Sequence, residues 1–391
     1  MKTLHIHIGT PKTATTAIQS FCKENAKVLE KHGYCYPIFP FYYPGNADAH
    51  NGKFLLSELF DENGNRDRMQ EEKNFREGMD IVLQLFETYD DIVVSDESIW
   101  RGMDSEKKGL WQLMKKEAEE NGFSLHVVVY FRRQDKYYLS HWNQQVKKLR
   151  SEETYEEYAE RVGRFRLDYY AKLERMASVI GKECITVRRF DRQEFVGGSI
   201  YADFLSVIGL SLTDEYVVTQ EMRNMGLYGN THEIKRILNG IPQMKDGKWQ
   251  MYFLDILQDC SEISKKQYPS EMMSKEEISE FLEAYRSGNR KVAEEYLHET
   301  GGDLFDYSVS DLPKWEKDNP YFIDDVVRVF GVAVAKLHQE NEDLKKELIK
   351  DMRKELNEVS AYVRHRKHPF QTVFRWIGRK FGGNKQKNAE A

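Results

Sequence analysis

The chain has 391 residues, of which 40% are hydrophobic and 13% aromatic, and its formal net charge is −6 at pH 7. This composition excludes a chain that is disordered throughout, and it suits one large α/β domain with a helical extension. The four cysteines show no metal-binding spacing, so we expect them to be reduced and structural. No apolar run reaches transmembrane length, and the first predicted strand begins too close to Met1 for a signal peptide. We therefore expect a cytoplasmic protein.

A phosphate-binding turn joins the first predicted strand to the first predicted helix. His5 and His7 alternate with apolar residues over about 3–8, as in a short strand, and we expect both histidines to be structural rather than a metal pair. An apolar helical face then extends over about 14–31. Between them lies Gly9-Thr10-Pro11-Lys12-Thr13-Ala14-Thr15-Thr16. Such a turn points backbone N–H groups and the positive end of a helix dipole at an anion, so the sequence predicts a phosphate or sulfate site.

The turn departs from the Walker A pattern, because Pro11 precedes Lys12 and Gly9 is its only glycine. It resembles the phosphosulfate-binding loop of the sulfotransferases that use 3′-phosphoadenosine 5′-phosphosulfate (PAPS), in which a strand leads into P-K-[ST]-G-T-T and a helix. Ala14 stands where that family usually has glycine. The alternative is an ordinary strand–turn–helix with a chance lysine. The resemblance implies that no metal ion is needed and that the donor is bound by the loop residues Thr10, Pro11, Lys12, Thr13, Ala14, Thr15 and Thr16.

A second signature follows the apolar run at 125–131, which is typical of a buried parallel strand. Arg132 comes directly after this run, and Ser140 lies eight residues further on, in a helix predicted from 135. The spacing resembles the segment with which sulfotransferases bind the 3′-phosphate of PAPS, and a planar guanidinium suits two phosphate oxygens. The alternative is that Arg132 and Arg133 form a solvated pair at a strand end. Weaker similarities to bacterial carbohydrate sulfotransferases extend over 184–210 and 289–305.

Two residues are candidates for the base that removes the proton of an acceptor hydroxyl. Glu97 follows the predicted strand at 91–95, in a stretch that resembles the corresponding site segment of the family; the alternative is a carboxylate at a helix start. His50 lies in a loop whose aromatic side chains offer a surface for a sugar ring, and imidazole titrates in the range that base catalysis near neutrality needs. The resemblance leaves the choice between Glu97 and His50 open.

The remaining elements of the first part of the chain continue the alternation of strand and helix. Helices are predicted near 72–88 and from Thr154 to Gly181, with Glu157 as the capping-box partner of Thr154, and a strand at 184–188. From about 215 to 330 the pattern becomes mainly helical. Strands separated by helices favour a parallel sheet, whose ligands bind beyond the carboxyl ends of the strands.

The C-terminal segment has a different character. Apolar residues recur in steps of three or four from Leu337 to Val363 on a highly charged helix, with Asn341 among them. This spacing predicts either pairing of two chains in a coiled coil, a homo-oligomer through 337–363, or packing on the chain's own domain. Residues 364–387 contain eight basic and no acidic residues, with apolar residues on one helical face. This tail predicts binding to an anionic membrane surface, with a packed helix as the alternative, and nucleic acid is disfavoured.

Together these features predict an α/β fold, a P-loop NTPase-like central parallel sheet flanked by helices, with a helical C-terminal extension. We expect a sulfotransferase-like core at 1–240, a helical part at 241–330, a long charged helix at 331–363 and a basic tail at 364–391. The resemblance implies transfer of a sulfuryl group from PAPS to a hydroxyl of a carbohydrate, such as a cell-surface or lipid-linked glycan, in the cytoplasm or at the inner face of the membrane. The alternatives are a P-loop kinase that uses Mg-ATP and a non-catalytic, membrane-associated scaffold that binds glycans.

Overall fold

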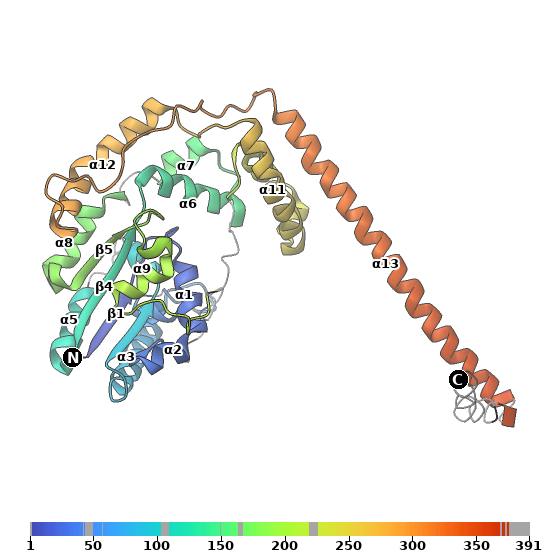
Figure 1. Ribbon diagram of the computed structural model, residues 1–391, viewed down its shortest axis with the longest axis horizontal. Helices are drawn as coiled ribbons and strands as arrows, with labels where there is room; N and C mark the ends of the chain where they lie inside the picture. Colours follow the sequence, from blue (N-terminus) through green and yellow to red (C-terminus); the bar gives the residue numbers. More distant parts are fainter. Residues whose placement is uncertain are drawn as a thin grey trace, which may run out of the picture. The chain divides into compact units, whose positions relative to one another are not determined.

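The computed structural model describes residues 2–41, 43, 50–56, 58–102, 109–148, 150–162, 167–218, 226–367, 370, 371 and 374. The chain divides into two units, Met1–Phe322 and Ile323–Ala391. The first unit contains a five-stranded sheet with helices on both faces, and the second contains one long helix (Figure 1). The predicted α/β fold, with a central parallel sheet and a helical C-terminal extension, is confirmed.

The sheet has the strand order β2-β3-β1-β4-β5, and every pairing is parallel. The strands are β1 (Thr3–His7), β2 (Tyr34–Cys35), β3 (Asp91–Ser95), β4 (Ser124–Phe131) and β5 (Ile185–Arg189). Predicted strands at 3–8, 91–95, 125–131 and 184–188 match four of them, whereas the two-residue β2 is too short to leave a periodic signal. In the register, His7 at the end of β1 lies beside Ser95 of β3 and Val128 of β4. The carboxyl ends of these three central strands therefore open on one edge of the sheet.

Two groups of helices cover the two faces of the sheet. On one face, Ile18 and Phe21 of α1 (Thr15–Glu24) and Phe204 of α9 (Ile200–Val207) pack with Val93 and Val128 of the sheet. The other face is covered by α3 (Arg68–Leu85), α5 (Leu110–Asn121), α8 (Tyr169–Ile180) and α12 (Lys275–Tyr296). The alternation of side chains along each strand supplies both faces with apolar residues, as expected of a sheet buried on both sides.

One predicted helix is wrong, because the segment 14–31 forms two helices. Helix α1 ends at Glu24, and α2 (Ala26–Lys31) begins after Asn25. The side chain of Asn25 accepts a hydrogen bond from the backbone N–H of Val217 at 2.7 Å and donates one to the carbonyl of Val217 at 2.9 Å. The Asn25 side chain therefore hydrogen-bonds a segment far along the chain, and the helix is interrupted at this residue.

A second predicted helix, from Thr154 to Gly181, is also divided, into α7 (Tyr155–Val162) and α8. Its capping box is confirmed: Thr154 N–H donates to the Glu157 carboxylate at 2.8 Å, and Glu157 N–H donates to Thr154 Oγ1 at 3.2 Å. Helix α7 packs with α6 (Gln134–Lys148) and α12 around aromatic side chains. The mainly helical region predicted after 215 contains α10 (Gly229–Asn239), α11 (Gly247–Gln267) and α12.

A row of hydrogen-bonded polar side chains crosses the buried sheet from β3 to β5. Asp91 of β3 contacts His5 Nε2 at 2.8 Å, His5 Nδ1 contacts His126 Nδ1 of β4 at 2.8 Å, and His126 Nε2 contacts Thr186 Oγ1 of β5 at 2.9 Å. Burial and the neighbouring His5 lower the pKa of His126 to about 4. Both nitrogens of His5 are thus hydrogen-bonded, as expected of a structural histidine.

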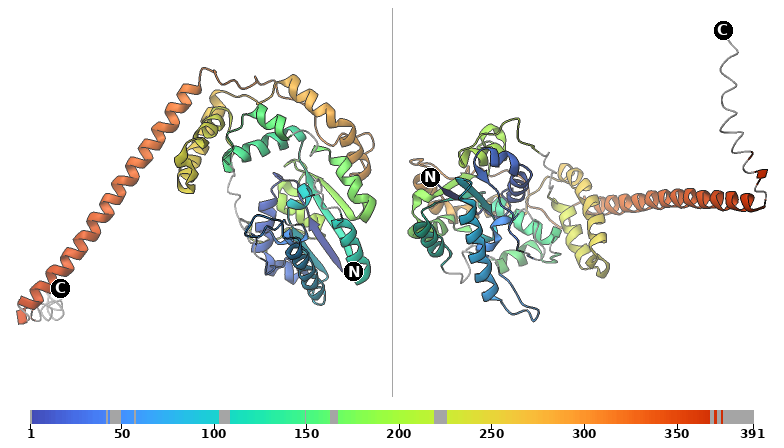
Figure 2. Two further views of the ribbon diagram at one scale, coloured as in Figure 1. Left: turned by 180° about the vertical axis from the view of Figure 1, so that it is seen from behind. Right: turned by 90° about the horizontal axis from the view of Figure 1, so that it is seen from below.

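Helix α13 (Phe322–Lys367) begins at the last residue of the first unit and continues through the second as a single uninterrupted helix of 46 residues (Figure 2). Most of the basic tail at 364–391 lies outside the described residues. Across the part of the chain that the structure describes, none of the helices has an apolar stretch long enough to cross a bilayer.

Candidate active site

The loop between β1 and α1 is held in place by its own threonines. Thr10 Oγ1 donates to the carbonyl of Tyr130 in β4 at 2.9 Å, and Thr13 Oγ1 donates to the carbonyl of Thr10 at 2.6 Å. Gly9 has a positive φ of 46°, and a Cβ at this position would lie 2.3 Å from Cγ2 of Thr15. Only glycine fits there, because the loop folds back against the start of α1.

The fold of the loop leaves a row of backbone donors available to a ligand. Lys12 and Ala14 have positive φ values of 74° and 57°, so the chain turns sharply before α1. The backbone N–H groups from Lys12 to Thr16 donate to no acceptor within the described part of the chain. Successive free N–H groups at the N-terminus of a helix form a concave site for an anion.

Two cations meet at this loop. Arg132, directly after β4, makes a long contact of 3.4 Å from Nη1 to the carbonyl of Lys12, and its guanidinium lies 5.8 Å from the ring centre of Phe190. Burial lowers the pKa of Lys12, and the cations Lys148 and Arg132 add to this effect, while Glu97 opposes it. Burial also lowers the pKa of Arg132. A cluster of half-buried cations favours an anionic ligand, which would relieve their mutual repulsion.

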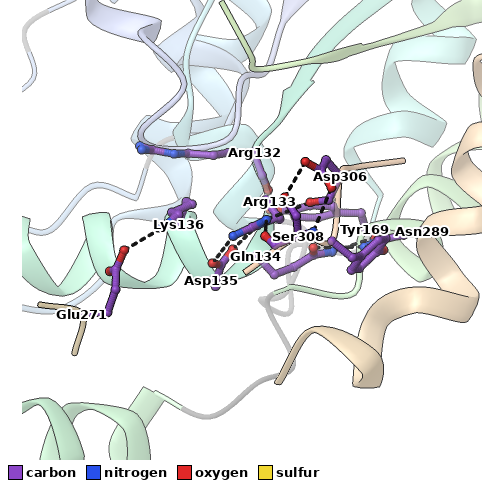
Figure 3. Close-up of polar contacts among 11 residues, drawn as sticks. Arg132, Arg133, Gln134, Asp135, Lys136, Tyr169, Glu271, Asn289, Asp306 and Ser308 are labelled. Carbon is purple, nitrogen blue, oxygen red and sulfur yellow. Dashed lines mark hydrogen bonds and ion pairs between the residues drawn. The ribbon is translucent and has the colours of Figure 1, made fainter. Parts of the chain in front are cut away.

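Arg132 and Arg133 have different roles, although they are adjacent. The Arg133 guanidinium binds both carboxylate oxygens of Asp135 at 2.8 Å and donates to the carbonyls of Asp306 and Ser308, each also at 2.8 Å. Figure 3 shows Arg132 pointing away from this cluster. Arg133 therefore fixes the start of α6 to the segment near 306–308, whereas the Arg132 side chain extends to the loop.

Two further cations of the site were not predicted from the sequence. Lys147 and Lys148 form the last turn of α6. Burial lowers the pKa of Lys147 to about 8, and the nearby charges of Lys12 and Lys148 add to the shift. In the sequence, lysines in the last turn of a helix indicate only a favourable interaction with its dipole. No pattern in the neighbouring sequence predicts that the last turn of α6 lies near the loop between β1 and α1.

Glu97 lies at the same edge, after β3. Its carboxylate accepts a hydrogen bond from the hydroxyl of Thr15, at the start of α1. Its charge raises the pKa of Lys12 and that of His50, so it is near both groups. A carboxylate near both a lysine and a histidine could exchange a proton with a bound hydroxyl.

His50 is fixed beside Glu97 by the residue that follows it. Asn51 donates to the carbonyls of Pro37 and Val93, each at 3.0 Å, and accepts from Ser95 N–H at 2.8 Å. His50 Nδ1 lies 3.8 Å from the buried Asp96 carboxylate. The polar contact with Asp96 raises the pKa of His50 against the effect of burial, and the Glu97 charge adds to it.

The other predicted residues occupy less central positions. Pro11 is buried in the loop, Thr16 is exposed on the first turn of α1, and Ser140 is partly buried on α6, two turns after its start. Beneath the loop, His7 Nδ1 contacts Ser95 Oγ at 2.8 Å, while its Nε2 has no hydrogen-bond partner among the described residues. Burial lowers the pKa of His7 to about 3, so this ring is neutral.

Comparison with known proteins gives two matches. No protein-family model matches the chain. An uncharacterized protein of Archaeoglobus fulgidus is 27% identical over 173 residues, which are 44% of this chain and 45% of that protein, so the chain spans less than half the length of this relative. The crystal structure of a sulfotransferase from Alicyclobacillus acidocaldarius matches over 56% of this chain and 86% of that one, with 15% identity and a TM-score of 0.34.

Proposed function

We propose that this chain is a sulfotransferase that moves a sulfuryl group from PAPS to a hydroxyl of a carbohydrate. The observation that carries the proposal is the meeting of Lys12, Arg132 and two candidate bases at the carboxyl edge of a parallel sheet. Ligands of such sheets bind at this edge. The resemblance of the loop and of the Arg132–Ser140 spacing to the PAPS-binding segments selects the donor.

Each part of the donor has a group of the protein to bind it. The free N–H groups from Lys12 to Thr16 would hold the 5′-phosphosulfate, and the Lys12 ammonium would stabilise the negative charge that grows on the leaving phosphate. Arg132 and Ser140 would bind the 3′-phosphate. Thr10 and Thr13 donate their hydroxyl protons within the loop, so we assign them to holding its shape.

The acceptor hydroxyl oxygen would attack sulfur while the bond from sulfur to the bridging oxygen breaks, and its proton would pass to Glu97 or to His50. The two candidates differ in their surroundings. Glu97 is hydrogen-bonded to Thr15 of the donor loop, whereas His50 lies 3.8 Å from the Asp96 carboxylate and precedes Asn51, which bonds the carbonyl of Val93 in β3. Whichever side chain accepts the proton, the product adenosine 3′,5′-bisphosphate would remain bound to Lys12 and Arg132.

The basic tail at 364–387 is part of the proposal, as the segment that brings the enzyme to an acceptor on an anionic membrane. Most of it lies outside the described residues, but Phe370 and Phe374 are 79% and 72% exposed. Several basic residues near anionic headgroups contribute about 1 kcal/mol each. A chain ending at Val363 should bind PAPS normally and no longer sediment with anionic vesicles. Sedimentation that is indifferent to lipid charge would contradict this part.

Thermal unfolding of the full-length protein tests the donor assignment. A ligand that binds only the native state stabilises it by about 2.7 kcal/mol at a hundred times its Kd. We expect adenosine 3′,5′-bisphosphate to raise Tm without added metal, and ATP with magnesium to have a much smaller effect. Stabilisation by Mg-ATP alone would identify a P-loop kinase, and the absence of any nucleotide effect would favour a scaffold that binds glycans.

A further inference from the structure

Apolar side chains form a continuous row on the surface of α13. Six of them have exposed fractions between 44 and 66%: Leu337, Leu344, Leu348, Met352, Leu356 and Val359. Asn341 continues the row between Leu337 and Leu344. We call these seven residues the α13 seam. Because water contacts most of this apolar surface in a single chain, covering it with another helix is favourable.

We propose that α13 pairs with α13 of a second copy of this chain, in parallel and in register. Leu337, Asn341, Leu344 and Leu348 follow steps of four, three and four residues, which is the spacing of the a and d positions of a coiled coil. Asn341 then occupies an a position. A single asparagine at such a position bonds its own counterpart across a parallel pair, and so fixes the register and the number of strands.

The charges beside the α13 seam fit the same arrangement. Glu340 occupies the g position before Asn341, and Lys345 occupies the next e position. In a parallel pair, Glu340 faces Lys345 of the partner subunit, and the two-fold symmetry repeats the contact. An antiparallel pair joins g with g and e with e, which brings like charges together. Within one chain, Lys345 contacts the Glu342 carboxylate at 2.8 Å, an exposed pair of little energetic weight.

Beyond Leu348 the α13 seam advances in steps of four residues to Leu356, and then by three to Val359. From Leu344 to Val359 the four steps cover 15 residues, which is more than about 3.6 residues per step, so the row turns gradually around a straight helix and pairing here unwinds the left-handed supercoil locally. Pairing therefore extends over the full α13 seam. It places two C-terminal tails at one end of the paired helices, so that two tails would bind one membrane surface together and with higher avidity than one.

Sedimentation velocity of the full-length protein tests the pairing. We expect a dimer at micromolar concentration, and Leu344→Glu or Leu348→Glu should weaken dimerisation by at least tenfold. Both positions are exposed, so unit 1 should unfold at an unchanged temperature in these variants. Ile349→Glu is the matched control, because Ile349 is 51% exposed but lies outside the α13 seam. A monomeric wild type, or equal weakening by Ile349→Glu, would overturn the proposal.

Disulfide trapping tests the orientation. Leu337→Cys and Val359→Cys should each cross-link to the same position of the partner under mild oxidation, and Ile349→Cys should not. An antiparallel pair brings at most one position opposite itself, so cross-linking at only one of the two sites would refute the parallel register. Glu340→Lys should weaken the dimer severalfold at low salt, and adding Lys345→Glu should restore it; no recovery would contradict the assigned charge contact.

Discussion

The two ends of the central sheet differ in whether their polar groups are paired by hydrogen bonds. In the amino-terminal half of the strands, Asp91, His5, His126 and Thr186 form a closed row of hydrogen bonds. At the carboxyl edge, the N–H groups from Lys12 to Thr16 have no acceptor within the described residues. Buried polar groups are normally paired, so a concentration of unpaired donors and crowded cations distinguishes the end of the sheet at which we propose that a ligand binds.

The largest effects should come from Lys12 and from the catalytic base, both at the carboxyl edge. Lys12→Ala removes the cation that we propose stabilises the leaving phosphate and should reduce sulfuryl transfer by about 10²–10³-fold or more, the range for loss of one preorganised charge contact. Steady-state rates measure the loss. Lys31→Ala is the control, because Lys31 is an exposed lysine on α2 that contacts Glu215 at 3.6 Å. Equal rates for wild type and Lys12→Ala would remove Lys12 from the mechanism.

The next comparison separates the two candidate bases. The variant that removes the true base should lose about 10²–10⁴ in turnover with donor affinity kept, whether this is Glu97→Gln or His50→Ala. The contact with Asp96 raises the pKa of His50 above 6.5. If His50 is the base, turnover of the wild type should fall as the pH drops through that raised value, because the protonated ring cannot accept a proton. Persistence of this limb in His50→Ala would exclude His50.

At the opposite end of the sheet, His126 should affect stability rather than transfer. Its folded-state pKa of about 4 lies below the unfolded value of 6.5, so the unfolded chain binds more protons between these values. The contribution of His126 to the free energy of unfolding is complete above pH 6.5 and is lost as the pH falls toward 4. Between pH 7.5 and 5 the loss is about 2 kcal/mol. His126→Gln should flatten this part of the curve of unfolding free energy against pH, and the exposed His338→Gln should not. An unchanged slope would contradict the buried neutral state.

The smallest expected effect concerns the shape of the loop. Ala14 adopts the left-handed conformation, with φ 57° and ψ 26°, which glycine adopts without strain. Ala14→Gly should raise the free energy of unfolding by about 1 kcal/mol. Chemical denaturation measures this change. A loss of stability would mean that the surrounding structure already favours alanine at this position.

The sequence located the parts of the candidate site that depend on local pattern. The loop, Glu97 and Arg132 each follow an apolar strand, and a parallel sheet brings such positions to one edge. The remaining features depend on contacts between distant segments. The helix break at Asn25 follows from its bonds to Val217, and the separate roles of Arg132 and Arg133 follow from the carbonyls near 306–308. Periodicity cannot report such contacts, nor can it place Lys147 beside the loop.

The most direct test of the account is a calorimetric titration that varies Arg132 and the 3′-phosphate together. Arg132→Ala should weaken adenosine 3′,5′-bisphosphate binding by about 1.5–3 kcal/mol, the value of a charge-assisted phosphate contact. Binding of adenosine 5′-monophosphate, which lacks the 3′-phosphate, should change little. Arg175→Ala, at an exposed arginine of α8, is the control for loss of positive charge. Equal affinity of wild type and Arg132→Ala for the bisphosphate, or equal losses for both nucleotides, would contradict the assignment of this edge as a PAPS site.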